Sequence, residues 1–314
     1  MLVKFYGVRG SIACAGAENQ RYGGNTSCVE VVVCGETLIF DAGTGLRKLG
    51  SDLIKTQGAT HIDAHLFLSH LHWDHIQGFP FFAPAFIPAT RLTVWGVSPR
   101  TVLDAVVVDP LNDQGHPTTQ EFSPADFLMP DPKAGVRAAL AGQMKAPNFP
   151  VGLDAMRANM SFCDVPEGER IELSPFVTVR HSSVDHPNGC VAWRVDGGGR
   201  SVVYATDVEL ADGVHGAVFE GLVDLARHAD LLIFDAMYTP EEYAGGAGRM
   251  SRKGWGHSTF EMGAAVAEAA GVKQLALFHH DPAHDDVFMD GLAARAQARL
   301  SSTFVAREGL EVNL

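Results

Sequence analysis

One short segment carries four side chains that can bind a metal ion. The eight residues that begin at position 68 read LSHLHWDH, so His70, His72, Asp74 and His75 lie within six residues of each other. Imidazole and carboxylate groups on one loop suit zinc, with manganese or iron as substitutes. A chance polar loop is the alternative. We interpret Trp73 as a packing residue rather than a chemical one.

Three further candidate ligands each follow a predicted strand. Asp207 comes at the end of the apolar run 202–206, His279 comes directly after 275–278, and His186 follows the strand-like run 176–180. Because strand carboxyl ends share one edge of an α/β sheet, these groups can converge with the first four. The alternatives are a turn or helix cap for Asp207 and hydrogen-bonded core histidines for the other two.

Together these seven residues can hold two metal ions. The assignment gives one ion to His70, His72 and His186, gives the other to Asp74, His75 and His279, and uses Asp207 as the bridge. Ions about 3.5 to 4 Å apart can hold a hydroxide that acts as a nucleophile, which is hydrolytic chemistry. The sequence contains no G-x-S-x-G elbow for a serine nucleophile.

Asp74, also a candidate ligand, and His257 are the candidate catalytic residues. His257 directly precedes Ser258-Thr-Phe-Glu261, which has the pattern of a capping box, so its ring is expected near a helix N-terminus. There it can protonate a leaving group or hold a phosphoryl oxygen; solvent exposure in a Gly-rich loop is the alternative.

Three more residues permit two interpretations each. Asp41 and Asp235 follow strands, where Asp41 can orient a ligand histidine or stabilise a turn, and Asp235 has the same two alternatives. Arg9, with the loop 23–27, can contact an anionic substrate or belong to a structural turn. His280 and Asp281 are expected to support ligands rather than to bind metal.

The elements that must position these groups alternate between strands and helices. Strands are predicted over 2–6, 28–33, 37–40, 64–69, 176–180, 191–195, 201–205, 231–234 and 275–278, with helices over 46–56 and 262–270. This pattern favours an α/β fold with two sheets between helical layers. We expect one domain over 1–314, with a Pro-rich insertion or lid at about 109–150 that contains one short helix near 135–144. The composition of the segment cannot form a core, yet Phe122, Phe127, Leu128 and Met129 are too apolar to be left in solvent. We therefore expect the segment to cover the active-site mouth or a subunit contact.

Composition limits the class of protein. The 314 residues are 46% hydrophobic and carry 24 Lys and Arg against 37 Asp and Glu, a net charge of −13. This charge argues against a broad nucleic-acid surface. Five cysteines without a C-x-x-C pair predict reduced, buried thiols, and no apolar run is long enough for a signal peptide or membrane span. We therefore expect a cytoplasmic protein.

The motif from His70 to His75, followed in order by His186, Asp207 and His279, resembles the metallo-β-lactamase superfamily. The runs FYGVRGS (5–11), YGGNTS (22–27) and DAGTG (41–45) resemble its opening strands, and Gly256-His-Ser-Thr259 resembles ribonuclease Z and its phosphodiesterase relatives. The resemblance implies an αββα sandwich of two mixed sheets, two zinc or manganese ions and phosphodiester hydrolysis.

The chain departs from ribonuclease Z in lacking a Gly- and basic-rich arm of the kind that grips transfer RNA. We therefore expect hydrolysis of a small, nucleotide-like phosphodiester, cyclic ones included, with two divalent ions as cofactors. Zinc is the first choice, with manganese or iron as alternatives. A lactone, thioester or β-lactam hydrolase and an RNA-processing endonuclease remain alternatives on the same site. A large nucleic acid and a membrane are not expected as partners, and a homodimer stays open.

Overall fold

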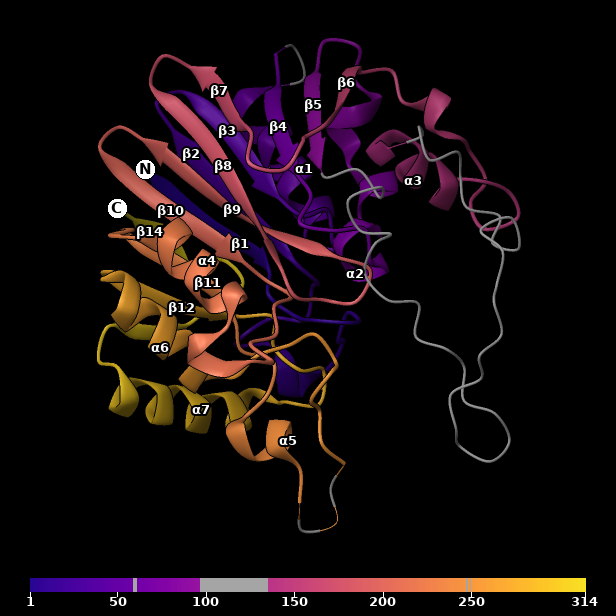
Figure 1. Cartoon of the computed structure of the whole chain (residues 1–314). Helices are drawn as coiled ribbons and strands as arrows, with labels where there is room; N and C mark the ends of the chain where they lie inside the picture. Colours follow the sequence, from indigo (N-terminus) through magenta and orange to yellow (C-terminus); the bar gives the residue numbers. More distant parts are fainter. Residues whose placement is uncertain (59–60, 97–134, 247, 249) are drawn as a thin grey trace, which may run out of the picture.

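Two seven-stranded sheets pack face to face, and helices cover their outer faces (Figure 1). The computed structural model describes residues 1–58, 61–96, 135–246, 248 and 250–314. Within these residues, no helix has the length and apolar character that crossing a membrane requires. All five cysteines are free, but the expected burial holds only for Cys28 and Cys190, whereas Cys34 is exposed. The two packed sheets with helices on their outer faces confirm the expected αββα sandwich.

The first sheet has the strand order β14-β1-β2-β3-β4-β5-β6. Its strands are β1 (Leu2–Gly7), β2 (Cys28–Val33), β3 (Glu36–Phe40), β4 (Asp63–Phe67), β5 (Arg91–Gly96), β6 (Asn159–Asp164) and β14 (Glu311–Asn313). The strands from β14 to β3 pair antiparallel, and those from β3 to β6 pair parallel. The last strand of the chain therefore pairs with the first.

The second sheet has the order β13-β12-β11-β10-β9-β8-β7. Its strands are β7 (Arg170–Ser174), β8 (Val177–Val184), β9 (Cys190–Gly197), β10 (Arg200–Ala205), β11 (Leu231–Asp235), β12 (Gln274–Phe278) and β13 (Thr303–Val305). Strands β7 to β10 are antiparallel, and β10 to β13 are parallel. In each sheet the parallel strands end at one edge, where polar side chains can gather.

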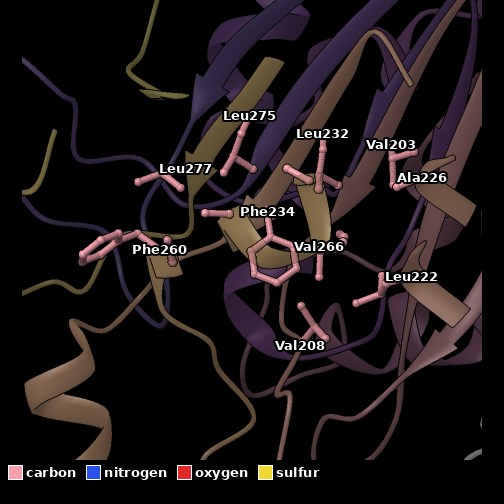
Figure 2. Packing of buried hydrophobic residues seen from close by; sticks show 14 of the residues in the cluster. Val203, Val208, Leu222, Ala226, Leu232, Phe234, Phe260, Val266, Leu275 and Leu277 are labelled. Atoms are coloured by element: carbon pink, nitrogen blue, oxygen red, sulfur yellow. The ribbon is translucent and has the colours of Figure 1, made fainter. Parts of the chain in front are cut away.

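Helices bury the outer face of each sheet. Helices α1 (Leu46–Gln57), α2 (Trp73–Ile76) and α3 (Gly135–Gln143) share an apolar cluster with the first sheet. Helices α4 (Ala217–Ala226), α6 (Phe260–Ala270) and α7 (Asp286–Arg299) share another with the second sheet, and Figure 2 shows Phe234 and Val266 within it. The short helix α5 (Pro240–Ala244) begins with a capping box at Thr239.

A third apolar cluster fills the space between the sheets. It joins Phe5 and Phe40 of the first sheet to Trp193, Tyr204 and Phe278 of the second. The Phe40 and Tyr204 rings lie 5.4 Å apart between centroids. Burying each such side chain contributes about 2 to 3 kcal/mol relative to exposure, so this layer holds the two sheets in fixed relation.

The two predicted helices are present, and one prediction about a helix start is wrong. Helices α1 and α6 match the predicted ranges, and Gly271 ends α6 in the left-handed region at φ 65°. The N-cap of α6 is Thr259, which accepts from the Met262 amide, rather than Ser258. Ser258 instead donates to the Val208 carbonyl oxygen at 2.6 Å, so its hydroxyl holds the strand-to-helix loop.

The Pro-rich segment is described only in its last part. Residues 109–134, which include Phe122, Phe127, Leu128 and Met129, lie outside the described residues. The short helix predicted near 135–144 is confirmed as α3. The expectation that this segment stays outside the core is wrong for its end, because Val136, Leu140 and Met144 are buried against the first sheet.

Candidate metal centre

The seven predicted ligand side chains lie together at the sheet edge where the parallel strands end. His70, His72, Asp74 and His75 follow β4, whereas His186, Asp207 and His279 follow β8, β10 and β12. The atoms that can bind metal lie within 4.8 Å of one another in each of three groups: His70, His72 and His186; His70, His75 and Asp207; Asp74, His75 and His279. The fold therefore brings residues more than 200 positions apart into one cluster.

Asp207 lies between the two groups of histidines. Its Oδ1 is 3.5 Å from His186 Nε2 and 3.7 Å from His70 Nε2. Its Oδ2 is 3.1 Å from His75 Nε2 and 3.2 Å from His279 Nε2. Each carboxylate oxygen thus faces a different pair of imidazoles, which is the arrangement that a bridging ligand requires.

Three strand ends at this edge have an unusual backbone. Asp41, Asp207 and His279 have φ values of 59°, 52° and 61°, in the left-handed region that residues other than glycine seldom occupy. Such conformations cost about 1 kcal/mol or more each and cluster at functional sites. The turn at each strand end directs the side chain toward the cluster rather than along the sheet.

Asp41 orients His75, which is one of the two interpretations the sequence left open. The carboxylate is fully buried, and its Oδ2 accepts from His75 Nδ1 at 2.7 Å. The same oxygen accepts from the Ser69 and Tyr204 hydroxyls at 2.8 Å each. Because Nδ1 of His75 is held by Asp41, Nε2 is the ring nitrogen that faces the cluster.

A residue that the sequence analysis missed supports His186. His186 Nδ1 donates to the Gly256 carbonyl oxygen at 2.8 Å. The buried carboxylate of Glu209 accepts from the Gly254 and Gly256 amides at 2.8 and 2.7 Å and from the Tyr243 hydroxyl at 2.7 Å. Glu209 therefore holds the loop that orients His186, a candidate ligand. A carboxylate between Val208 and Leu210, two residues after Asp207, is the only sequence signal of this role.

A Cβ atom at Gly256 would stand 2.2 Å from His186 Nδ1, and φ is 83° at this position. Glycine is therefore required there, both for the backbone conformation and for the close approach of the ring.

Asp235 holds His257 beside the cluster. His257 Nδ1 donates to Asp235 Oδ2 at 2.8 Å and lies 4.0 Å from Asp207 Oδ1. His257 is 8% exposed and stands two residues before the N-cap of α6. No described residue hydrogen-bonds its other ring nitrogen, Nε2. The predicted solvent-exposed alternative for His257 is wrong.

Burial and neighbouring charge set the ionisation of the histidines. Burial lowers the pKa of His70 and His186 and lowers that of His72 to about 4, so all three present neutral rings at neutral pH. Burial acts against the charge on His257, but the adjacent Asp235 carboxylate outweighs it and raises the pKa of His257 to about 9. Three of the histidines, His70, His72 and His186, are therefore neutral, whereas His257 is protonated.

The carboxylates of the cluster stay ionised. Burial alone would raise the pKa of Asp207 and Asp74, but the neighbouring histidines hold both below the ordinary range. For His75 the balance is reversed, because Asp207, Asp74 and Asp41 raise its pKa against the effect of burial. The negative charge is concentrated where a cation would bind.

The donor set fits divalent metal ions. Among the residues that the structure describes, none forms a hydrogen bond with the buried Nε2 of His70. His75 Nε2 and His279 Nε2 face each other at 3.3 Å, and His186 Nε2 faces His72 Nδ1 at 3.0 Å. A cation placed among these closely spaced ring nitrogens would give each of them, and the unpartnered nitrogen of His70, a ligand bond. His75 and His186 use their other nitrogens for protein contacts, as metal-binding histidines do.

The segment after β1 supports the cluster from the amino-terminal side. The Ser11 amide donates to Asp74 Oδ2 at 2.7 Å. A Cβ atom at Gly10 would stand 2.4 Å from His279 Cε1, so glycine is needed for the ring to occupy its place. Neither role is visible in the sequence alone.

For Arg9 the structural one of the two interpretations holds, whereas the expectation for Trp73 is wrong. Arg9 is fully buried, and its guanidinium donates to three backbone carbonyl oxygens and to Asn19 Oδ1, so it holds loops together and is not available to a substrate. Trp73 is 73% exposed rather than packed. His280, expected to support a ligand, hydrogen-bonds the Ala306 carbonyl oxygen at 2.8 Å through Nε2.

Known proteins share this architecture. A ribonuclease Z of Picosynechococcus sp. is 34% identical over alignments that cover 88% of this chain and 86% of the relative. The metallo-β-lactamase fold protein YhfI of Bacillus subtilis superposes with a TM-score of 0.64 at 18% identity, covering 99% of each chain. The short form of human tRNase Z superposes with a TM-score of 0.62 at 18% identity, covering 100% of this chain and 99% of the other.

Fold and cluster together define a metal-dependent hydrolase. The family model of the β-lactamase superfamily domain matches residues 36–280, and the chain belongs to this superfamily. The ribonuclease Z branch that the sequence resembles is confirmed among its curated relatives.

Proposed function

We propose that the protein is a phosphodiesterase with two divalent metal ions that acts on a small, nucleotide-like phosphodiester. The observation that carries this proposal is the His257 and Asp235 pair, 2.8 Å apart, beside Asp207. A protonated imidazole next to a cationic centre suits a charged phosphoryl group better than a neutral carbonyl. A cytoplasmic location remains part of the proposal.

The proposed ligand set follows the geometry of the cluster. His70, His72 and His186 would hold one ion, Asp74, His75 and His279 the other, and Asp207 both. When bound, such ions activate water and stabilise charge on the phosphoryl oxygens. We propose zinc, with manganese or iron as alternatives. Asp74 is also proposed to be catalytic, because it lies 3.2 Å from His75 Nε2 and 3.4 Å from His279 Nε2.

In this scheme His257 supplies the proton for the leaving group. Asp235 fixes the ring through Nδ1, so that Nε2 faces away from Asp235 and can donate to the departing oxygen. The fixed ring avoids the entropy cost of orienting a mobile acid during the reaction.

A panel of substrates tests the proposed class. Protein loaded with zinc or manganese is assayed with bis(p-nitrophenyl) phosphate, p-nitrophenyl phosphate, a lactone and nitrocefin, and its metal content is measured. We expect close to two ions per chain and the highest kcat/KM on the diester. A tenfold higher kcat/KM on nitrocefin or the lactone would reject the substrate class.

An RNA-processing endonuclease is the second candidate, because curated relatives are named ribonuclease Z. The net charge of −13 works against binding a large polyanion. Cleavage of a precursor transfer RNA with a kcat/KM above that for small diesters would favour this candidate.

A further inference from the structure

An aromatic and cationic turn lies next to His257. Trp255 is 47% exposed, and the guanidinium carbon of Arg252 lies 4.3 Å from the centroid of its ring. The same guanidinium lies 5.8 Å from the Tyr238 ring, which is buried and contacts His257 edge-on at 5.8 Å. These contacts link the exposed indole to the proposed acid of the site.

Hydrogen bonds hold the backbone of this turn in place, although the turn is exposed. The Trp255 amide donates to the Arg252 carbonyl oxygen at 3.2 Å, which closes the turn. Glu209 accepts from the amides on either side of Trp255, those of Gly254 and Gly256, at 2.8 and 2.7 Å. The indole is therefore presented from a fixed backbone, so that little conformational entropy is lost when a ring stacks on it.

The chemistry of the turn suits a heterocycle attached to a phosphate. One face of an exposed indole offers a stacking surface to any base, and Arg252 with Lys253 adds positive charge to a chain with a net charge of −13. Among the described residues Arg252 forms no ion pair, and its guanidinium lies over aromatic rings instead. Trp73 is also exposed, beside His72, but no cation among the described residues stacks on its ring.

We propose that Trp255, backed by Arg252, stacks the nucleobase of the substrate and selects base-bearing phosphodiesters over simple alkyl ones. This inference rests on the proposed phosphodiesterase function and adds to it the residue that recognises the base. The base lies on the His257 side of the site, and the scissile phosphate lies at the metal cluster. Stacking acts on binding, so it lowers KM more than it raises kcat.

Two diesters that share one leaving group test the proposal. Thymidine 5′-monophosphate p-nitrophenyl ester carries a base, and ethyl p-nitrophenyl phosphate does not, but both release p-nitrophenolate. With metal-loaded protein, Trp255→Ala should lower kcat/KM for the thymidine diester by about 5- to 150-fold, the range expected for one stacked base, mainly through KM. The ethyl diester should stay within about twofold, and Trp255→Phe should restore most of the loss.

Phe176→Ala is the matched control. Phe176 is 71% exposed and precedes β8 at its amino end, whereas His186 follows the other end of that strand. This variant should leave both diesters unchanged. An equal fall on both diesters, or no fall in Trp255→Ala, would overturn the proposal.

A binding measurement separates this proposal from the phosphodiesterase function itself. If the parent protein hydrolyses neither diester, the proposed function fails. Calorimetry then compares thymidine 5′-monophosphate with ethyl phosphate on the metal-loaded protein. If Trp255→Ala binds thymidine 5′-monophosphate more weakly than the parent protein does but binds ethyl phosphate equally well, stacking on Trp255 is supported. If the parent protein and Trp255→Ala bind the nucleotide equally well, the proposal is rejected.

Discussion

The two sheets contribute to the metal cluster in different ways. The first sheet provides His70, His72, Asp74 and His75 from one loop after β4. The second sheet provides its groups one at a time, from the ends of separate strands. Within the loop, spacing along the chain sets the relative positions of the ligands. In the second sheet, pairing between the strands sets them.

The difference extends to the groups that orient the ligands. Asp41 contacts His75 from β3, which is adjacent to β4 in the same sheet. In the second sheet, His186 depends on a chain of contacts through Gly256 to Glu209. We expect substitution of Asp41 to affect the ligands in the loop after β4, and substitution of Glu209 to affect His186.

The largest effect on metal binding and activity is expected at Asp207, which lies between the two groups of histidines. Asp207→Ala removes the carboxylate that faces both pairs of histidines, so both halves lose a ligand. Metal content should fall, and activity should fall by about 10³-fold or more, since several kcal/mol of stabilisation is lost. Metal analysis and kcat/KM on a diester measure both effects. A variant that keeps two ions and most activity would remove Asp207 from its proposed role.

The next largest effect separates proton transfer from metal binding. His257→Ala should keep the bound metal and the fold while the rate falls by about 10²- to 10⁴-fold, the usual worth of a positioned acid. The loss should be smaller with p-nitrophenolate as leaving group, because it hardly needs protonation. Asp235→Asn should show the same pattern in weaker form. Loss of metal in His257→Ala would make His257 a ligand or a structural support instead.

Two supporting carboxylates allow a direct comparison of the sheets. Asp41→Asn and Glu209→Gln should each weaken metal binding by about 10- to 100-fold, as expected for groups that orient ligands. Competition with a chelator measures the affinity of each ion. We expect Asp41→Asn to weaken the ion near His75 and Glu209→Gln to weaken the ion near His186.

Asp230→Asn is the matched control for these two variants. Asp230 is also a buried carboxylate, but it precedes β11 and accepts from the Ser201 amide and Lys273, away from the cluster. It should change stability and leave both metal affinities unchanged. If Glu209→Gln behaves like Asp230→Asn, the loop contact to His186 is structural only.

The smallest expected effect is on stability alone. Although burial opposes ionisation, His284 and the Thr239 amide hold the pKa of Glu242 at about 2. A depressed carboxyl pKa stabilises the fold above the unfolded value of about 4.5, and this contribution disappears as the pH falls toward 2. Glu242→Gln should therefore cost about 1 to 2 kcal/mol at pH 7, after allowance for solvent screening. Urea unfolding should show the difference from the parent shrinking between pH 4.5 and 2; a constant difference would contradict this origin.

The sequence by itself determined the local features of this protein. Spacing within six residues grouped His70 with His75, and apolar runs predicted the strands that precede Asp207 and His279. The range of helix α6 followed from the Ala-rich run after Ser258-Thr-Phe-Glu261 and from Gly271. These features depend on neighbours along the chain, and such neighbours are visible in the sequence.

Only the tertiary structure decided which polar groups meet. Arg9 and Asp41 both follow strands in Gly-rich surroundings, yet one holds backbone carbonyls together and the other orients a ligand histidine. Glu209 reaches a loop 47 residues further along the chain. Such contacts depend on strand order and on the packing between sheets, because a buried polar group must pair with whichever partner the fold places beside it.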